Sequence, residues 1–316
     1  MTSAVKLSVV IHAEEEFDWD GGFYRSNHQV THHNGLIAVV DQIIEHGGKV
    51  TLAMDYAFVT SAGGQKVVDY YRQQEGDNIE FATHLHPWVN PPYENEQNKI
   101  ESRYSYPCNL EQEQEYQKLK YLTETIETIT GVRPTTYLAG RYGIGDNTAK
   151  ILKELGYSVD LSISAYVDFT HQQGPNFSQF TNRCFTQNDI QYFPHTGSVL
   201  SLLPPLTNYL NRNPELFTRI GENKLSSLVG KFLRIRRYRL SPEGFTFKQM
   251  KQVTESQMAV GQEEFILSFH SPSAKPGLTP YVNTQADLTE FRSQIAQYLS
   301  WFFTLENSCS LLPKQK

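Results

Sequence analysis

The sequence contains few cysteines, and they lie far apart. Cys108, Cys184 and Cys309 are the only three in 316 residues, and no two of them are separated by just two residues. A disulfide framework and a thiolate metal site both need more cysteines at closer spacing. The sequence therefore predicts neither, and it predicts a protein whose thiols stay reduced.

The sequence also lacks long apolar segments and an excess of positive charge. The apolar run at 7–11 is too short for a signal peptide, and no segment reaches the roughly 20 apolar residues that span a bilayer. The net charge of −6 gives no reason to expect nucleic acid or an anionic membrane as the main partner. These absences predict a soluble, cytoplasmic protein without a transmembrane segment.

Short apolar runs alternate with longer segments of helical periodicity along most of the chain. We expect strands at 6–13, 49–55, 78–86, 135–141, 157–164 and 263–270, and helices at 34–48, 59–74, 111–131, 147–155, 246–260 and 284–304. This alternation predicts an α/β fold with a mainly parallel sheet, either open or closed into a barrel. Residues 165–245 hold clusters of proline and glycine, which are typical of an elaborated loop region. No repeat or linker is visible, so we expect one domain over 1–316.

Several of the expected strands end in polar side chains. In parallel α/β sheets and barrels, the carboxyl ends of the strands meet at one mouth, where active sites form. The polar residues at these ends are His12, Glu14, Glu15, Asp55, His84, His86, Arg141 and His270. We therefore expect carboxylates, imidazoles and a guanidinium to surround one mouth.

His84 and His86 are the strongest sign of a metal site. They are two residues apart, so on a strand both rings lie on the same face. Two imidazoles and a carboxylate from a neighbouring strand match the ligand set of a catalytic divalent metal with open positions. Taken alone, the pair would more simply be two ordinary polar histidines. The other polar strand ends favour the metal.

Arg141 and His270 are candidates for supporting roles. An arginine that ends a strand, followed by a glycine-containing turn, can pair with a carboxylate and keep it ionised, although a surface arginine would fit equally well. His270 follows an apolar run and suits a general acid near neutral pH. Taken alone, however, His270 is better interpreted as a hydrogen-bonded core histidine.

Taken in order, six passages of the sequence resemble a known family. They are EEEFDWD (14–20), THLHPW (83–88), LAGRYGIG (138–145), GPNFS (174–178), LSFHSPS (267–273) and PGLTPYV (276–282). The set is similar to the polysaccharide deacetylases, the carbohydrate esterases of NodB homology, and most of all to their WalW-like bacterial branch. The resemblance implies a distorted (β/α) barrel with about seven strand–helix units and an elaborated loop region. It also implies a hydrolase that removes acetyl groups from N- or O-acetylated sugars of a surface glycan, such as lipopolysaccharide, or of its precursor.

The resemblance further implies a divalent metal, most often Zn²⁺, and assigns roles to individual residues. Glu14 would be the catalytic base, kept ionised by Arg141, and His270 would be the general acid. Glu15 would bind the metal together with His84 and His86, with Glu16 as the alternative to Glu15. Leu267 would form a wall of the substrate pocket.

The sequence leaves the roles of several other residues undecided, and it allows two alternative functions. Trp88 and Tyr142 could stack on sugar rings, and Asp55 and Asp168 could bind sugar hydroxyls. The basic run at 231–240 is most simply a solvated helix face, with peripheral contact to an anionic glycan or membrane as the alternative. A catalytically inactive glycan-binding relative, or a hydrolase of a non-sugar amide, would share the same motifs.

Overall fold

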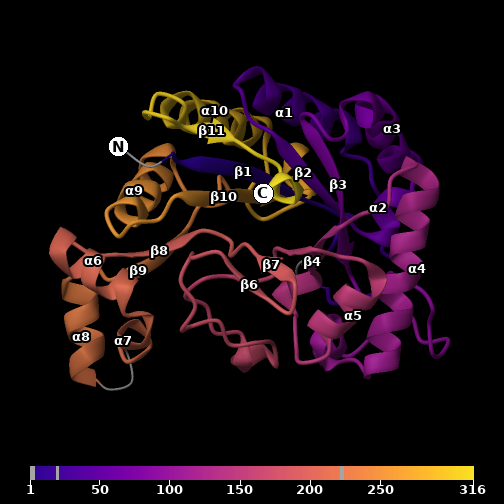
Figure 1. Ribbon diagram of the computed structural model, residues 1–316, viewed down its shortest axis with the longest axis horizontal. Helices are drawn as coiled ribbons and strands as arrows, with labels where there is room; N and C mark the ends of the chain where they lie inside the picture. The colour runs from indigo at the N-terminus through magenta and orange to yellow at the C-terminus, as the bar shows by residue number, and fades with distance from the viewer. Residues whose placement is uncertain (1–3, 19–20, 221–223) are drawn as a thin grey trace.

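The computed structural model describes residues 4–18, 21–220 and 224–316 (Figure 1). Most of its strands belong to one sheet: β1 (Lys6–Ala13), β2 (Val50–Met54), β3 (Ile79–Leu85), β4 (Thr136–Ala139), β5 (Val159–Asp160), β6 (Phe185–Gln187), β7 (Ile190–Tyr192), β10 (Glu264–His270) and β11 (Cys309–Ser310). Within the described residues this nine-stranded sheet has the order β10-β1-β2-β3-β4-β5-β7-β6, and β11 pairs with β1. Neighbouring strands run parallel except β6 and β7, which are antiparallel.

The central strands are buried on both faces, which explains their nearly continuous apolar runs. Every residue of β2 and β3 is buried, as is all of β1 except its first residue. Helices cover the outside of the sheet, and each turns an apolar stripe inward, as α1 does with Leu36, Val39, Val40 and Ile43. These helices are α1 (His33–Glu45), α2 (Tyr56–Thr60), α3 (Ala62–Tyr71), α4 (Gln112–Thr130), α5 (Thr148–Leu155), α9 (Phe247–Met258) and α10 (Gln285–Phe302).

Leu240 joins the two sides of the curled sheet. Its backbone N–H donates to the carbonyl of Thr196 (2.9 Å), and its carbonyl accepts from the N–H of Ser268 on β10 (3.1 Å). The segment that contains Thr196 follows β5 and β7, since His195 donates to the carbonyl of Ile163 (2.7 Å). The parallel sheet thus curls into a distorted barrel, and the α/β barrel predicted from the sequence is confirmed.

Residues 165–245 contain more regular structure than the expected loop region. A two-stranded antiparallel ribbon, β8 (Gly197–Leu200) and β9 (Arg236–Arg239), carries three helices, α6 (Pro204–Arg212), α7 (Pro214–Thr218) and α8 (Lys224–Phe232). This part of the chain has its own small apolar core, built around Tyr166, Val199 and Leu210. The basic run at 231–240 is therefore not one helix face, because it ends α8 and then forms β9.

Among the described helices, none is both long and apolar enough to cross a bilayer.

Candidate active site

A cavity of about 720 Å³ opens where the central strands end. Its walls include His12, Glu14, His84, His86 and His270, which come from β1, β3 and β10 or directly follow them. Because these strands are parallel, their carboxyl ends point to the same edge of the sheet. Arg141 lines the cavity as well, so the structure brings six of the eight polar strand-end residues to a single cavity.

Glu14 lies against both histidines of the His84–His86 pair. One of its carboxylate oxygens, Oε2, is 3.6 Å from Nε2 of His84 and also 3.6 Å from Nε2 of His86. The backbone of Glu14 is fixed by Ser271, whose Oγ accepts from the Glu14 N–H (3.1 Å). All three side chains are almost completely buried. Oε2 of Glu14 therefore lies equally close to one nitrogen of each imidazole, in the wall of the cavity.

The hydrogen bonds of the two imidazoles decide which nitrogen faces this point. Nδ1 of His84 lies 2.9 Å from the carbonyl oxygen of Leu138, and Nδ1 of His86 lies 2.9 Å from Oε2 of Glu15. An oxygen acceptor at Nδ1 favours the tautomer with its proton there, so that Nε2 carries the lone pair. Two lone pairs and a carboxylate oxygen then meet with no donor between them.

Such a donor set fits a divalent metal ion. Ligand atoms held about 2.0–2.2 Å from one tetrahedral ion lie roughly 3.3–3.6 Å from one another, which matches the separations of Glu14 from the two rings. Metal-binding histidines usually donate their other N–H to a carbonyl or a carboxylate, as His84 and His86 do. Glu14, His84 and His86 could therefore hold a metal. His12 belongs to the same neighbourhood, since the ligand atoms of His12, Glu14 and His84 lie within 4.8 Å of one another.

Glu15 lies on the far side of His86 from Glu14. Besides its contact with Nδ1 of His86, its Oε1 accepts from Nε1 of Trp88 (2.7 Å). Asp55 supports this arrangement, since its Oδ2 accepts from the N–H of Glu15 (3.2 Å) and lies 3.2 Å from Nδ1 of His86. Sequence reasoning gave the ligand position to Glu15, and the ligand atoms of Glu15, Asp55 and His86 do lie within 4.8 Å of one another. Glu14 is the carboxylate that lies beside both His84 and His86.

The electrostatics of this cluster follow from burial and proximity. Burial, followed by the negative charge of Glu15, raises the pKa of Asp55 to about 7. Burial opposes a positive charge on His86, but the neighbouring Glu15 and Asp55 raise the pKa of His86. Burial, and then the nearby His86, lowers the pKa of His84. Negative charge is thus concentrated behind His86, where it strengthens the basicity of that ring.

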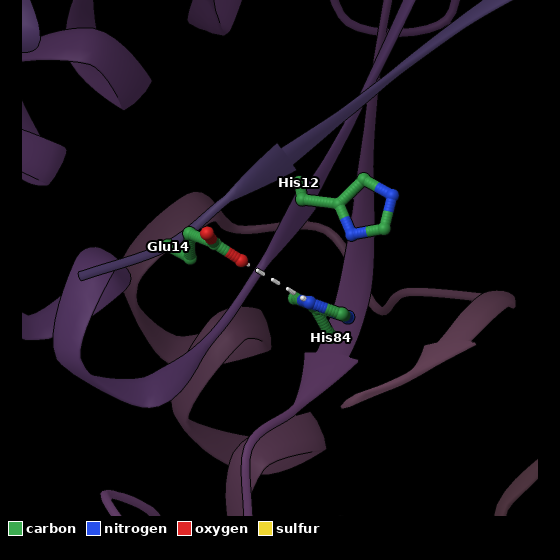
Figure 2. Close-up of side chains that lie close together, drawn as sticks. All are labelled: His12, Glu14 and His84. Atoms are coloured by element: carbon green, nitrogen blue, oxygen red, sulfur yellow. Dashed lines mark ion pairs between the residues drawn. The ribbon is translucent and has the colours of Figure 1, made fainter. Parts of the chain in front are cut away.

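His12 stands beside Glu14 and His84 (Figure 2). His12 lies in β1 and Glu14 directly follows that strand, and the figure shows the Glu14 carboxylate directed at His84. The ligand atoms of His12, Glu14 and His84 all lie within 4.8 Å of one another. The His12 ring also lies 4.6 Å from the His270 ring, centroid to centroid, and burial and then His270 lower its pKa. His12 is thus a buried imidazole at the cavity wall, next to the candidate metal ligands.

His270 is oriented by a carboxylate that sequence reasoning did not identify. Oε2 of Glu243 lies 2.8 Å from Nδ1 of His270, and Oε1 of Glu243 accepts from Ser273 Oγ (2.5 Å). Glu243 is buried and lies in the loop after β9. Burial opposes a charge on His270, but Glu243 and then Glu14 raise its pKa. Glu243 thus fixes the Nδ1 side of the His270 imidazole.

Arg141 lines the cavity but does not pair with Glu14. Its Nη1 donates to Oγ of Ser105 (2.6 Å) and its Nη2 donates to Oε1 of Gln172. Its guanidinium carbon lies 4.0 Å from the centroid of the Tyr106 ring. Within the described residues its charge has no carboxylate partner, so the role of orienting a base finds no geometric support.

The remaining predicted residues fall into two groups. Trp88 and Tyr142 line the cavity. Leu267 is fully buried in β10 as part of the main core, and Asp55 is fully buried behind His86. Asp168 accepts from the N–H of Thr170 (2.8 Å) in an exposed turn. The structure thus leaves Trp88 and Tyr142 in position to contact a ligand, and gives the other three structural surroundings.

Three further side chains near the cavity were not expected from the sequence. Arg239 lines the cavity, Glu243 holds His270, and the His195 ring lies 5.6 Å from the His12 ring. All three lie within residues 165–245, where the sequence has no periodic pattern that indicates which way a side chain points. The basic run at 231–240 was the one available signal, since it contains Arg239.

Comparisons with known proteins show a similarity in fold. No protein-family model matches the sequence, and no curated protein sequence matches it. Among solved structures, a probable polysaccharide deacetylase from Pseudomonas aeruginosa is 12% identical, with a TM-score of 0.52 over 98% of this chain and 88% of that chain. The 4-alpha-glucanotransferase from Thermococcus litoralis is 8% identical, with a TM-score of 0.53 over 99% of this chain, which spans only 40% of that protein. The chain therefore shares its fold with both proteins.

Proposed function

We propose that this protein is a metal-dependent hydrolase that removes acetyl groups from an acetylated sugar. The observation that carries the proposal is the contact of Glu14 with both His84 and His86 in the wall of a cavity that also carries aromatic rings. Catalytic metal sites combine such imidazole and carboxylate ligands with open coordination positions. The fold shared with a probable polysaccharide deacetylase agrees with this activity.

In the proposed reaction, Glu14, His84 and His86 would hold a divalent ion such as Zn²⁺. When bound, the ion supplies Lewis acidity, which polarises a carbonyl group and lowers the pKa of water. Glu15 and the carbonyl of Leu138 keep Nε2 of each imidazole available by holding the Nδ1 side. The sugar would lie along Trp88 and Tyr142, since aromatic faces suit the apolar faces of sugar rings.

Two histidines at the cavity wall would move the protons. His12 lies beside Glu14 and His84 and is the imidazole best placed to accept a proton from the attacking water. His270, held by Glu243 at Nδ1, would donate a proton from Nε2 to the departing sugar nitrogen or oxygen. This assignment differs from the base role expected for Glu14, because the Glu14 carboxylate faces the two metal-ligand nitrogens.

The finer substrate assignment rests on the sequence resemblance. The motifs at 14–20, 83–88 and 138–145 resemble enzymes that act on bacterial surface glycans or their precursors, and we propose substrates of that class. Purified protein loaded with Zn²⁺ should release acetate from at least one member of a panel of N- and O-acetylated sugars, both free and lipid-linked. Tight binding to a panel member without any acetate release would instead support an inactive glycan-binding protein.

A further inference from the structure

Arg141 directs a positive charge into the cavity that its protein surroundings do not neutralise. Its hydrogen-bond acceptors are neutral, namely Ser105 and Gln172, together with the more distant carbonyl of Ser102 at 3.5 Å. Within 4–18, 21–220 and 224–316, no carboxylate is close enough to form an ion pair with it. A partly buried and unpaired cation is unfavourable unless a ligand compensates it.

Two aromatic rings hold the guanidinium of Arg141 in place. Its central carbon lies 4.0 Å from the centroid of the Tyr106 ring and 4.9 Å from that of the Phe23 ring. Contacts of this kind fix the orientation of an arginine and leave its charge intact. The planar N–H fork is then preorganised for the two oxygens of a carboxylate or a phosphate.

The backbone at this position is also unusual. Arg141 has φ of 54° and the next residue, Tyr142, has φ of 60°, so two consecutive non-glycine residues adopt the left-handed conformation. Such conformations are costly for residues with a Cβ atom, and they concentrate at ligand-binding and catalytic sites. Both side chains line the cavity, so the strained turn aims both of them at the same space.

The rest of the cavity wall has the same electrostatic character. Lys99 and Arg239 line it together with Arg141, and Glu14 is the only carboxylate among the described lining residues. Glu14 faces the two metal-ligand nitrogens, so its charge is directed away from these cations. A divalent ion at that position would make the cavity more positive still. The cavity is therefore suited to a ligand that carries negative charge.

We propose that Arg141 forms a subsite for an anionic group, a carboxylate or a phosphate, on the same substrate whose acetyl group lies at Glu14, His84 and His86. The inference rests on the proposed function and narrows its substrate class to acetylated sugars that bear an acidic group. Lys99 lies on the same cavity wall and adds to the attraction.

The test compares acetylated sugars that differ only in charge: N-acetylglucosamine, its derivative with a lactyl carboxylate, and its 6-phosphate. We expect kcat/KM for at least one anionic sugar to exceed that for the neutral sugar by about tenfold or more, as a charged hydrogen bond would give. Arg141→Gln should abolish this ratio, and Arg141→Lys should keep part of it. The carboxylate and phosphate arms identify which anion is preferred.

Arg103→Gln is the matched control, because Arg103 is exposed, lies 4.6 Å from the Tyr104 ring and lines a different cavity. It should leave the ratio unchanged. Calorimetric titration with the same sugars separates the two proposals, since binding does not require turnover. Equal binding of neutral and anionic sugars, or an equal loss of both in Arg141→Gln, would overturn the subsite. Preferential anion binding without acetate release would overturn only the deacetylase activity.

A separate surface, on α8, carries three apolar side chains that point outward. Leu228, Val229 and Phe232 are 65%, 46% and 79% exposed, while Gly230 on the opposite side is buried. In a helix that merely packs on a protein core, the apolar stripe faces inward. Figure 1 shows α8 with α6 and α7 at one end of the molecule, away from β1 and β2. We call Leu228, Val229 and Phe232 the α8 face.

Positive charge surrounds the α8 face. Lys224 and Lys231 are exposed on the same helix, and Arg234 and Arg236 are exposed directly after it. Residues 201–240 contain eight lysines and arginines but only two glutamates, in a chain whose net charge is −6. A second copy docked through the same face would bring like charges together. An anionic bilayer would accept both the apolar side chains and the cations.

The geometry of this end of the molecule points to peripheral binding of the α8 face to an anionic lipid bilayer. Wild-type protein should sediment with vesicles that contain about 30% phosphatidylglycerol, should not sediment with pure phosphatidylcholine vesicles, and should dissociate as salt is raised. Phe232→Asp should abolish sedimentation, while Phe232→Leu and the distant exposed Lys66→Glu should retain it.

Three results would overturn this second proposal. They are absence of binding to either vesicle, equal binding of Phe232→Asp and wild type, and lipid-free dimerisation that Phe232→Asp abolishes. None of these measurements depends on enzymatic activity, so they are independent of the proposed function.

Discussion

Glu14 and Glu15 are consecutive in the sequence but lie on opposite sides of the His86 ring. Oε2 of Glu14 is 3.6 Å from Nε2 of His86, and Oε2 of Glu15 is 2.9 Å from Nδ1 of the same ring. Side chains that follow one another along an extended chain point in opposite directions, so both carboxylates can act on one imidazole. Glu14 faces the candidate metal position, and Glu15 holds the ring that faces it.

Removing Glu14 should therefore remove the metal. We expect Glu14→Ala to weaken Zn²⁺ binding by more than about 100-fold, because even the outer partners of metal ligands are worth about 10–100-fold. Calorimetric titration of metal-free protein with Zn²⁺ measures this effect. A Glu14→Ala variant that binds Zn²⁺ like wild type would return Glu14 to the role of a base.

Glu15 should affect the metal indirectly. Glu15→Gln leaves Nε2 of His86 in place but replaces its charged partner at Nδ1, so we expect Zn²⁺ binding to weaken by about 10–100-fold. Glu16→Gln is the matched control, because Glu16 accepts from the N–H of Thr31 and lies beside His32. If Glu16→Gln lost more affinity than Glu15→Gln, the arrangement around His86 would be wrong.

His12 should affect turnover while leaving the metal bound. We expect His12→Asn to lower kcat by about 10²–10⁴-fold, the range typical of a missing general base, with nearly normal Zn²⁺ affinity. Acetate release and Zn²⁺ titration on the same preparation separate the two effects. Loss of Zn²⁺ in His12→Asn would identify His12 as a ligand, and unchanged kcat would exclude it as a base.

Gly140 should not tolerate a larger residue. A Cβ atom there would collide with the carbonyl oxygen of Leu85 and would lie 2.9 Å from Cδ2 of His86. We expect Gly140→Ala to lower the free energy of unfolding by about 1–3 kcal/mol, as overpacking does, and to weaken Zn²⁺ binding by displacing the His86 ring. If Gly140→Ala matches wild type in both thermal unfolding and Zn²⁺ titration, the space between Gly140 and the Leu85 carbonyl is wider than the structure indicates.

Because of Glu115, the free energy of unfolding should fall as the pH rises. It is buried on α4, where its Oε1 accepts from Thr148 Oγ1 (2.7 Å), and burial raises its pKa to about 7. A carboxyl group whose pKa is higher in the folded state than in the unfolded state contributes fully to protein stability below the unfolded-state pKa. This contribution is lost as the pH rises through the folded-state pKa, here about 7. Glu115→Gln should therefore gain on the order of 2 kcal/mol over wild type between about pH 5 and pH 8.

Urea unfolding at the two pH values measures this difference. Glu113→Gln, which changes an exposed residue of the same helix, should show little pH-dependent difference from wild type. A Glu115→Gln variant whose stability relative to wild type is the same at both pH values would show that Glu115 titrates normally.

The barrel was predictable from the sequence because its strands are buried. The apolar run at 6–13 matches β1 residue for residue, and the run at 78–86 differs from β3 by one residue at each end. The expected strand at 157–164 shortens to β5 because only Val159 and Asp160 are paired along both edges, although Ser164 forms a further isolated bridge with His195.

The details of the site depended on geometry that a linear pattern does not contain. Whether Glu14 or Glu15 faces His84 depends on how the chain leaves β1 after Ala13. The direction of the Arg141 side chain depends on the left-handed backbone conformation of Arg141 and Tyr142. Neither residue is a glycine, so the sequence does not indicate this conformation. Glu243 reaches His270 from a loop 27 positions earlier, within the segment that had no clear periodicity.

The central claim is that Glu14, His84 and His86 hold the metal of a carbohydrate deacetylase. Acetate release from an acetylated sugar, measured before chelation, after chelation and after re-addition of Zn²⁺, tests this claim most directly. We predict that wild type loses activity on chelation and regains it with Zn²⁺, whereas Glu14→Ala is inactive throughout at the same Zn²⁺ concentration. Acetate release that survives chelation, or that persists in Glu14→Ala, would contradict the account.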